Sequence, residues 1–216
     1  MVARLDHITV VAPTLEAGAA YVEAALGMLP GAGRTHPHMA THNLLLALGS
    51  EVYLEVISVD LAAVPATRPR WFGLDLALPG SPPRLAAWVA STDDIAKAAT
   101  PELGVIELMR REHHIWAMTV RRDGSVPLGG AAPLLIQRSS SGSPVAALPP
   151  KDLVFRRLLV RHPAPSEVVA LFAKIGLVSQ PSVIVAEGNE CSLIAEIQTP
   201  LGLRELGGPN PLNLSI

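Results

Sequence analysis

Residues 5–27 of the chain read LDHITVVAPTLEAGAAYVEAALG, and this stretch decides the fold. Its first part, residues 5–11, is rich in β-branched residues, which favour a strand. Thr14 is a typical helix N-cap, and the apolar residues that follow it recur at helical spacing until Gly27, a typical stop signal. The sequence therefore predicts a strand followed directly by an amphipathic helix.

Further strands are predicted after this helix. Two apolar runs cover residues 43–48 and 51–59, and the Gly-Ser pair between them is typical of a tight hairpin turn. A short additional strand is expected near residues 33–35. The N-terminal part of the chain therefore reads as a β-α-β-β-β unit.

The same order of elements returns twice along the chain. A second copy covers residues 85–137, and a third follows it. A unit of this kind cannot bury its sheet face alone, so copies are expected to pair. We predict an α+β fold in which residues 1–138 hold two paired units. A Ser/Pro-rich linker, residues 139–150, would join them to a third β-α-β-β-β-like unit in residues 151–216.

Composition and charge exclude several classes of protein. The chain has 216 residues, 49% hydrophobic and 17% charged, as expected for a globular protein with a sizeable core. Its formal net charge of −2 gives no reason to expect a nucleic acid or a membrane as partner. Cys191 is the only cysteine, so no internal disulfide can form. Because we find no signal-peptide pattern and no apolar run of membrane-spanning length, we expect a cytoplasmic protein.

Polar side chains share one face of two predicted strands in the first unit. Alternation puts His7 and Thr9 on one face of the first strand, and Tyr53 and Glu55 on one face of the last. The opposite faces are apolar and should meet the helices. An imidazole and a carboxylate together on the open face favour a divalent metal ion. The alternative is a buried hydrogen-bonded pair of His7 and Glu55.

Three segments of the sequence resemble a known family. They are residues 5–8 (LDHI), residues 34–43 (RTHPHMATHN) and residues 53–57 (YLEVI). These segments resemble the glyoxalase-like domain family of the vicinal-oxygen-chelate superfamily, which also contains glyoxalase I, extradiol dioxygenases and bleomycin-resistance proteins. The resemblance implies that the paired units form a curved mixed sheet around a cavity.

The resemblance also implies metal ligands on the first and last strands of each unit. His7 and Glu55 match these positions in the first unit. In the second unit Leu85 stands opposite His7, and Gln137 stands at the position equivalent to Glu55. Arg157 takes the His7 position in the third unit. His7, Glu55 and Gln137 are therefore the candidate ligands of a divalent ion such as Zn, Ni, Mn or Fe.

Four residues are candidates for binding a small molecule in the cavity. His42 and Asn43 open a strand near the expected rim, where their side chains can hydrogen-bond a ligand, and His42 is an alternative third metal ligand. Trp71 and Trp116 are candidates for an apolar pocket wall; core or interface packing is the alternative for both.

Two functions stay open from the sequence. In the first, the protein is a metal-dependent lyase, isomerase or dioxygenase, in which Glu55 moves a proton while the ion polarises two substrate oxygens. In the second, it binds a small, mostly apolar molecule without a metal, as the antibiotic-sequestering relatives do. A homodimer is expected in both, because a half-barrel with an apolar open face favours pairing.

Overall fold

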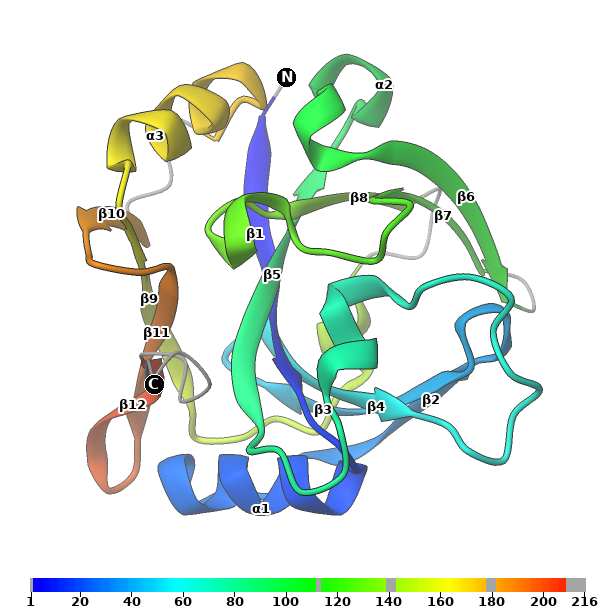
Figure 1. The fold of residues 1–216 in the computed structure, drawn as a ribbon. Helices are drawn as coiled ribbons and strands as arrows, with labels where there is room; N and C mark the ends of the chain where they lie inside the picture. Colours follow the sequence, from blue (N-terminus) through cyan, green and yellow to red (C-terminus); the bar gives the residue numbers. More distant parts are fainter. Residues whose placement is uncertain (1, 112–113, 139–142, 178–181, 209–216) are drawn as a thin grey trace.

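An eight-stranded mixed sheet forms the body of the protein (Figure 1). The computed structural model describes residues 2–111, 114–138, 143–177 and 182–208. The strands of the large sheet are β1 (Ala3–Val11), β2 (Gly31–His36), β3 (Thr41–Ala47), β4 (Tyr53–Val59), β5 (Arg84–Thr92), β6 (Val105–Arg111), β7 (His114–Val120) and β8 (Leu134–Arg138). Helices α1 (Leu15–Leu26) and α2 (Ile95–Ala98) and 3-10 turns connect them.

The start and end of α1 follow from the sequence. The hydroxyl of Thr14 accepts a hydrogen bond from the backbone N–H of Ala17, as an N-cap does. Gly27 ends the helix in the left-handed conformation, with φ of 71°. Gly18 lets the helix lie close to the sheet, because a Cβ at this position would stand 2.3 Å from Cγ1 of Val56. The predicted strand–helix pair is therefore present.

Two units meet at the centre of the large sheet. Its strand order is β2-β3-β4-β1-β5-β8-β7-β6. In each unit the first strand pairs with the last in parallel, β1 with β4 and β5 with β8. The two units join through the antiparallel pair of β1 and β5. This arrangement confirms the predicted α+β fold of repeated β-α-β-β-β units in a curved mixed sheet.

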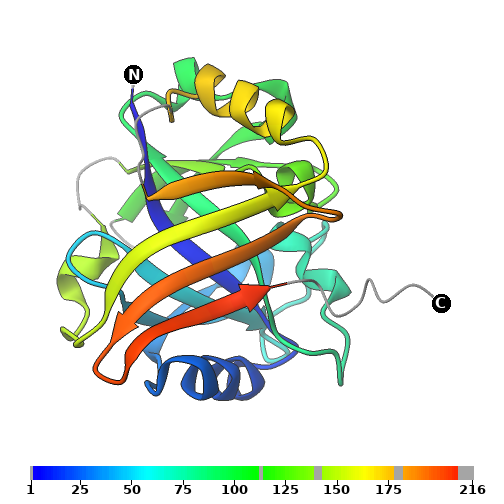
Figure 2. The ribbon, with the colours of Figure 1, turned by 90° about the vertical axis from the view of Figure 1, so that its left-hand side faces the viewer.

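The C-terminal part of the chain forms a separate four-stranded sheet (Figure 2). It contains β9 (Val154–His162), β10 (Val183–Glu187), β11 (Ser192–Thr199) and β12 (Gly202–Gly208), with helix α3 (Pro165–Lys174) after β9. The elements follow the predicted order along the chain, but the strand order is β10-β9-β11-β12. The first strand of this unit therefore lies inside its sheet, between β10 and β11, and does not pair with another unit.

The four-stranded sheet covers the convex face of the large sheet. Ile8 and Trp88 on the large sheet belong to the same buried apolar cluster as Val160 and Phe172 of the C-terminal part. The rings of Trp88 and Phe172 meet edge to face, with centroids 5.6 Å apart. The division of the chain into residues 1–138 and residues 151–216 stays a prediction, and residues 139–142 of the expected linker lie outside the described residues.

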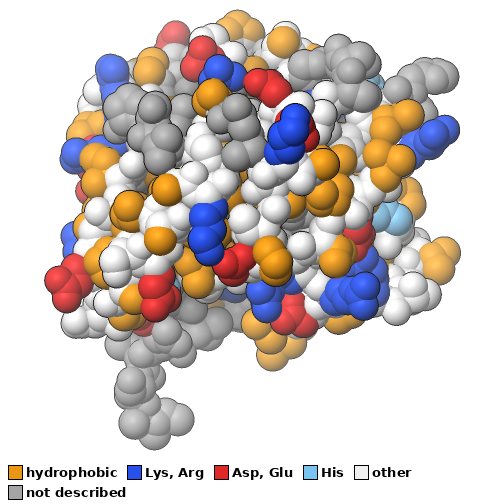
Figure 3. Space-filling model, turned by 90° about the horizontal axis from the view of Figure 1, so that it is seen from above, with side chains coloured by type: hydrophobic (Ala, Val, Ile, Leu, Met, Phe, Trp, Pro, Cys, Tyr) orange, Lys and Arg blue, Asp and Glu red, His pale blue; other side chains and the backbone are white. Residues whose placement is uncertain are grey.

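Side chains of different kinds are mixed on one face of the surface. Lys/Arg, Asp/Glu and apolar side chains alternate over the face that Figure 3 presents, without a continuous basic patch. In the described part of the chain, every helix is too short or too polar to cross a membrane.

Candidate functional site

The concave face of the large sheet encloses a cavity of about 340 Å³. Both units line it, so the cavity lies across the seam between them. Its volume falls in the range of small-molecule sites in proteins. The apolar part of the wall includes Leu45, Phe72, Met118 and Ile136. The polar part includes His7, Arg34, His36, Asn43, Glu55 and Arg138.

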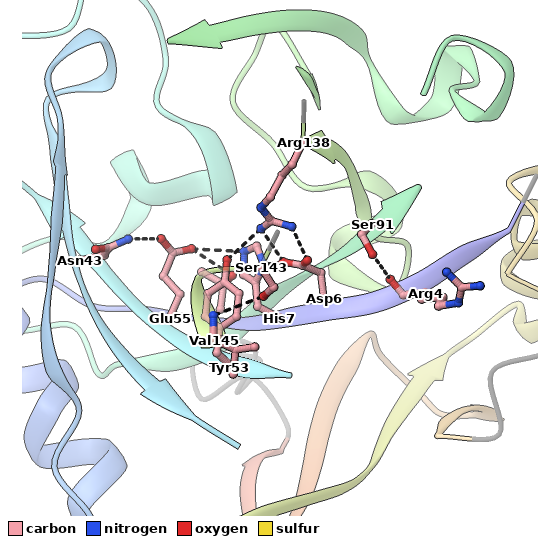
Figure 4. A network of polar contacts seen from close by, with 11 residues as sticks. Arg4, Asp6, His7, Asn43, Tyr53, Glu55, Ser91, Arg138, Ser143 and Val145 are labelled. Atoms are coloured by element: carbon pink, nitrogen blue, oxygen red, sulfur yellow. Dashed lines mark hydrogen bonds and ion pairs between the residues drawn. The ribbon is translucent and has the colours of Figure 1, made fainter. Parts of the chain in front are cut away.

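His7 lies between two carboxylates on the cavity wall (Figure 4). Its Nδ1 is 2.7 Å from Oδ1 of Asp6, and its Nε2 is 3.6 Å from Oε2 of Glu55. The ring of Tyr53 stacks on the imidazole, with centroids 4.5 Å apart. The contact with Asp6 and the stacking on Tyr53 fix the orientation of the ring, so that Nε2 lies near Glu55.

Asp6 is held in turn by Arg138 of the second unit. Nη1 and Nη2 of Arg138 donate to the two carboxylate oxygens of Asp6, the Nη2 bond at 2.8 Å. Nη2 also lies 3.3 Å from the hydroxyl of Tyr53. The pairing of β1 with β5 is irregular between Leu5 and His7, at Asp6 itself. Asp6 thus links His7 to the second unit.

Glu55 has its own hydrogen-bond donors. Nδ2 of Asn43 donates to Oε1 at 2.6 Å, and the hydroxyl of Thr9 donates to Oε2 at 3.4 Å. Oδ1 of Asn43 accepts the backbone N–H of Arg34 at 2.6 Å. Asn43 therefore connects β2 to the carboxylate, and its amide holds Glu55 in place at the cavity wall.

The charged groups of this cluster shift one another's pKa values. Burial acts to raise the pKa of Asp6, but hydrogen bonds from His7 and Arg138 outweigh it and hold that pKa well below its usual range. For Glu55, burial also acts to raise the pKa, and the contact with His7 lowers it overall. Burial acts to lower the pKa of His7, but the two carboxylates raise it above its usual value. The arrangement favours a protonated His7 between two ionised carboxylates.

The side chains around His7 offer fewer ligands than a catalytic metal ion usually has. A catalytic zinc site usually has three protein ligands. Within residues 2–111, 114–138, 143–177 and 182–208, no three His, Cys, Asp or Glu side chains are arranged to hold a metal. His7 and Glu55 supply two donors, and the raised pKa of His7 means that a metal would have to displace a proton. The described residues do not fit a stable metal centre.

Gln137, the expected third ligand, lies away from this cluster. Its Oε1 accepts the backbone N–H of Ile95 at 2.8 Å, and its Nε2 donates to the carbonyl of Asp93 at 3.0 Å. The amide thus holds the start of α2. Alternation along β8 is the reason, because Ile136 and Arg138 line the cavity and the residue between them faces the other way. The cavity position expected for Gln137 is taken by Arg138.

His42 also lies outside the cavity, whereas its neighbour Asn43 lines it. Alternation along β3 is the reason, because Asn43 and Leu45 line the cavity and the side chain of His42 points to the other face of the strand. His36 on β2 lines the cavity in its place, buried and in edge contact with the ring of Trp71 at 5.3 Å. His36 is therefore part of the site, although it was not among the candidates from the sequence.

Trp71 and Trp116 both line the cavity, in agreement with one of the two interpretations open from the sequence. Trp71 is 4% exposed and begins a 3-10 turn, Trp71–Leu76. Within the part of the chain that the structure describes, its buried indole Nε1 has no hydrogen-bond acceptor. An unsatisfied buried donor is uncommon and needs an explanation.

The fold and the cavity define a protein built from paired β-α-β-β-β units with a small-molecule site on the concave face. The sequence matches the glyoxalase-like domain family over residues 5–176, and the chain belongs to that family. This match confirms the resemblance seen in the sequence. Among curated proteins, the comparison finds no match.

Several solved structures are similar to this chain at low sequence identity. A hypothetical protein from Staphylococcus aureus is 14% identical, with a TM-score of 0.60 and 88% of each chain covered. Methylmalonyl-CoA epimerase from Mycobacterium tuberculosis is 17% identical, with a TM-score of 0.40, covering 67% of this chain and 91% of the enzyme. A variant of 4-hydroxymandelate synthase from Streptomyces coelicolor is 12% identical, with a TM-score of 0.46, covering 93% of this chain and 60% of the synthase. The first similarity supports the fold alone.

Proposed function

We propose that this protein binds a small, mostly apolar molecule in its concave cavity and does so without a metal ion. The observation that carries the proposal is a buried charged pair in a largely apolar wall. His7 is held by Asp6, and Glu55 is held by Asn43 and Thr9. Hydrogen bonds within the protein therefore already satisfy some of the polar atoms of each side chain. The remaining polar atoms of the pair are placed to orient one polar group of a ligand.

The spacing of the pair indicates which ligand group it suits. Nε2 of His7 and Oε2 of Glu55 are 3.6 Å apart, longer than a good hydrogen bond. A protonated imidazole donates and a carboxylate accepts. A hydroxyl oxygen can accept from His7 and donate its proton to Glu55. We therefore expect the ligand to place a hydroxyl, or a similar donor–acceptor group, against this pair.

The same pair favours a second function, proton transfer on the bound molecule. A protonated His7 beside an ionised Glu55 places one proton donor and one proton acceptor in the same site. In such a lyase or isomerase, Glu55 is the catalytic base, and His7 donates to the oxygen on which charge develops. Turnover of a bound compound would distinguish this function from simple binding.

Metal content and cavity binding test the proposal together. Untagged protein is analysed by inductively coupled plasma mass spectrometry, beside a His7→Ala, Glu55→Ala double variant. We expect far less than one metal ion per chain in both proteins. Stoichiometric Zn, Ni, Mn or Fe in the native protein, lost in the variant, would contradict the proposal and favour metal-dependent chemistry.

Binding of a neutral probe then tests whether the cavity takes up a small molecule. Binding of 2-naphthol, which carries one hydroxyl on a flat apolar body, is followed by tryptophan fluorescence in the presence of a chelator. We expect saturable binding that the chelator leaves unchanged. Ala147→Trp, which adds bulk at an exposed lining position, should abolish it. Binding that survives this substitution would place the probe outside the cavity.

A further inference from the structure

We infer that the natural ligand of the cavity is a flat aromatic carboxylate, whose anionic group lies toward Arg34. This inference rests on the proposed function and names the ligand class of the same site. It is carried by two observations: the charge balance of the described lining residues and the aromatic part of the wall.

The charge balance of the described lining residues leaves one cation in excess. Among the described lining residues Glu55 is the only carboxylate, and it lies beside His7. Arg138 is neutralised by the carboxylate of Asp6, just outside the lining. The exposed guanidinium of Arg34 has no carboxylate within 4.0 Å in the described part of the chain. A cavity with one uncompensated guanidinium favours a monoanion.

The donors of Arg34 define the polar group of the ligand. A guanidinium offers donors alone. A carboxylate supplies acceptors and a negative charge, so it complements this group, whereas a primary amide is uncharged and an ammonium group carries the wrong charge.

The aromatic wall defines the body of the ligand. The rings of Trp71, Phe72 and Trp116 all line the cavity, and the rings of Trp71 and Phe72 lie 5.8 Å apart. Aromatic side chains interact well with flat rings through stacked or edge contacts. A volume of about 340 Å³ accommodates a one-ring or two-ring compound. The inferred ligand thus combines one negative charge with a flat apolar body.

A matched pair of probes tests this ligand class. Isothermal titration calorimetry is run with 2-naphthoate and with 2-naphthamide, which share the same rings and differ in charge. We expect 2-naphthoate to bind about tenfold more tightly at low ionic strength, the size of one charge-assisted contact. Arg34→Gln should remove this preference. Arg204→Gln, an exposed arginine on β12, is the control and should keep it.

Equal binding of the two probes, or a preference that survives Arg34→Gln, would overturn the ligand class and leave cavity binding intact. If neither probe nor 2-naphthol binds to the native protein, the proposed function fails as well.

Discussion

Arg138 and Asp6 form a paired contact between residues 132 positions apart in the sequence. Both carboxylate oxygens of Asp6 accept from the guanidinium, at a position where Asp6 is 4% exposed. The pair connects β8 of the second unit to β1 of the first, directly behind His7. It therefore stabilises the seam and the cavity wall at once.

Arg138→Met is expected to lower the free energy of unfolding by about 3 kcal/mol, because it leaves the buried Asp6 carboxylate without its cation. Urea unfolding followed by circular dichroism measures the loss. Adding Asp6→Asn to this variant should recover part of it, since the second change removes the unpaired charge. A midpoint for Arg138→Met equal to that of the native protein would contradict this role.

Asp6 should also make the protein sensitive to acid. Its pKa in the folded protein lies well below the usual value of about 4, so its contribution to stability is fully present above that value. The contribution is lost as the pH falls toward the folded pKa. The difference in unfolding free energy between native protein and Asp6→Asn should therefore shrink between about pH 5 and pH 2. A difference that is constant over this range would show that Asp6 is not held as an ion.

His7 should titrate in the opposite sense. Its pKa is raised in the folded protein, so the stability it contributes is present below the unfolded value of about 6.5 and is lost as the pH rises through the folded pKa. Nuclear magnetic resonance of the imidazole protons measures that pKa directly. Glu55→Gln removes one of the two neighbouring carboxylates and should lower it. An unchanged His7 pKa in Glu55→Gln would show that the Glu55 carboxylate does not influence the imidazole.

Gly18→Ala tests the close approach of α1 to the sheet. The added Cβ would stand 2.3 Å from Cγ1 of Val56 and 2.9 Å from Cβ of Ala12, so we expect a loss of about 1–3 kcal/mol in unfolding free energy. Gly31→Ala is the matched control, because its nearest atom is 3.8 Å away, at the carbonyl of Leu45. Equal midpoints for the two variants in thermal unfolding would show that α1 shifts without cost.

Local patterns in the sequence were sufficient to predict the order of helices and strands and to place the His7–Glu55 pair on one face of the sheet. The helix signals at Thr14 and Gly27 depend on neighbouring residues alone, and alternation was enough to place His7 and Glu55 on one face. The structure brings Asn43, Trp71 and Trp116 to the same cavity.

The remaining features depend on contacts between distant strands. Arg138 faces the cavity and Gln137 does not, because the register of β8 is set by its pairing with β5 and β7. No local signal marks Arg138 as the partner of Asp6, since the two lie in different units. The strand order of the C-terminal sheet is likewise a choice of pairing partner, which the order of elements along the chain does not determine.

Strand β1 lies between the cavity and the apolar core beneath the C-terminal sheet. His7 faces the cavity, and the next residue, Ile8, is fully buried in the apolar layer beneath the C-terminal sheet. A substitution that disrupts the packing of that apolar layer, even far from the cavity, should therefore make the backbone at His7 more mobile. No described residue after Ala147 lines the cavity, so the C-terminal sheet supports the binding surface without contributing side chains to it.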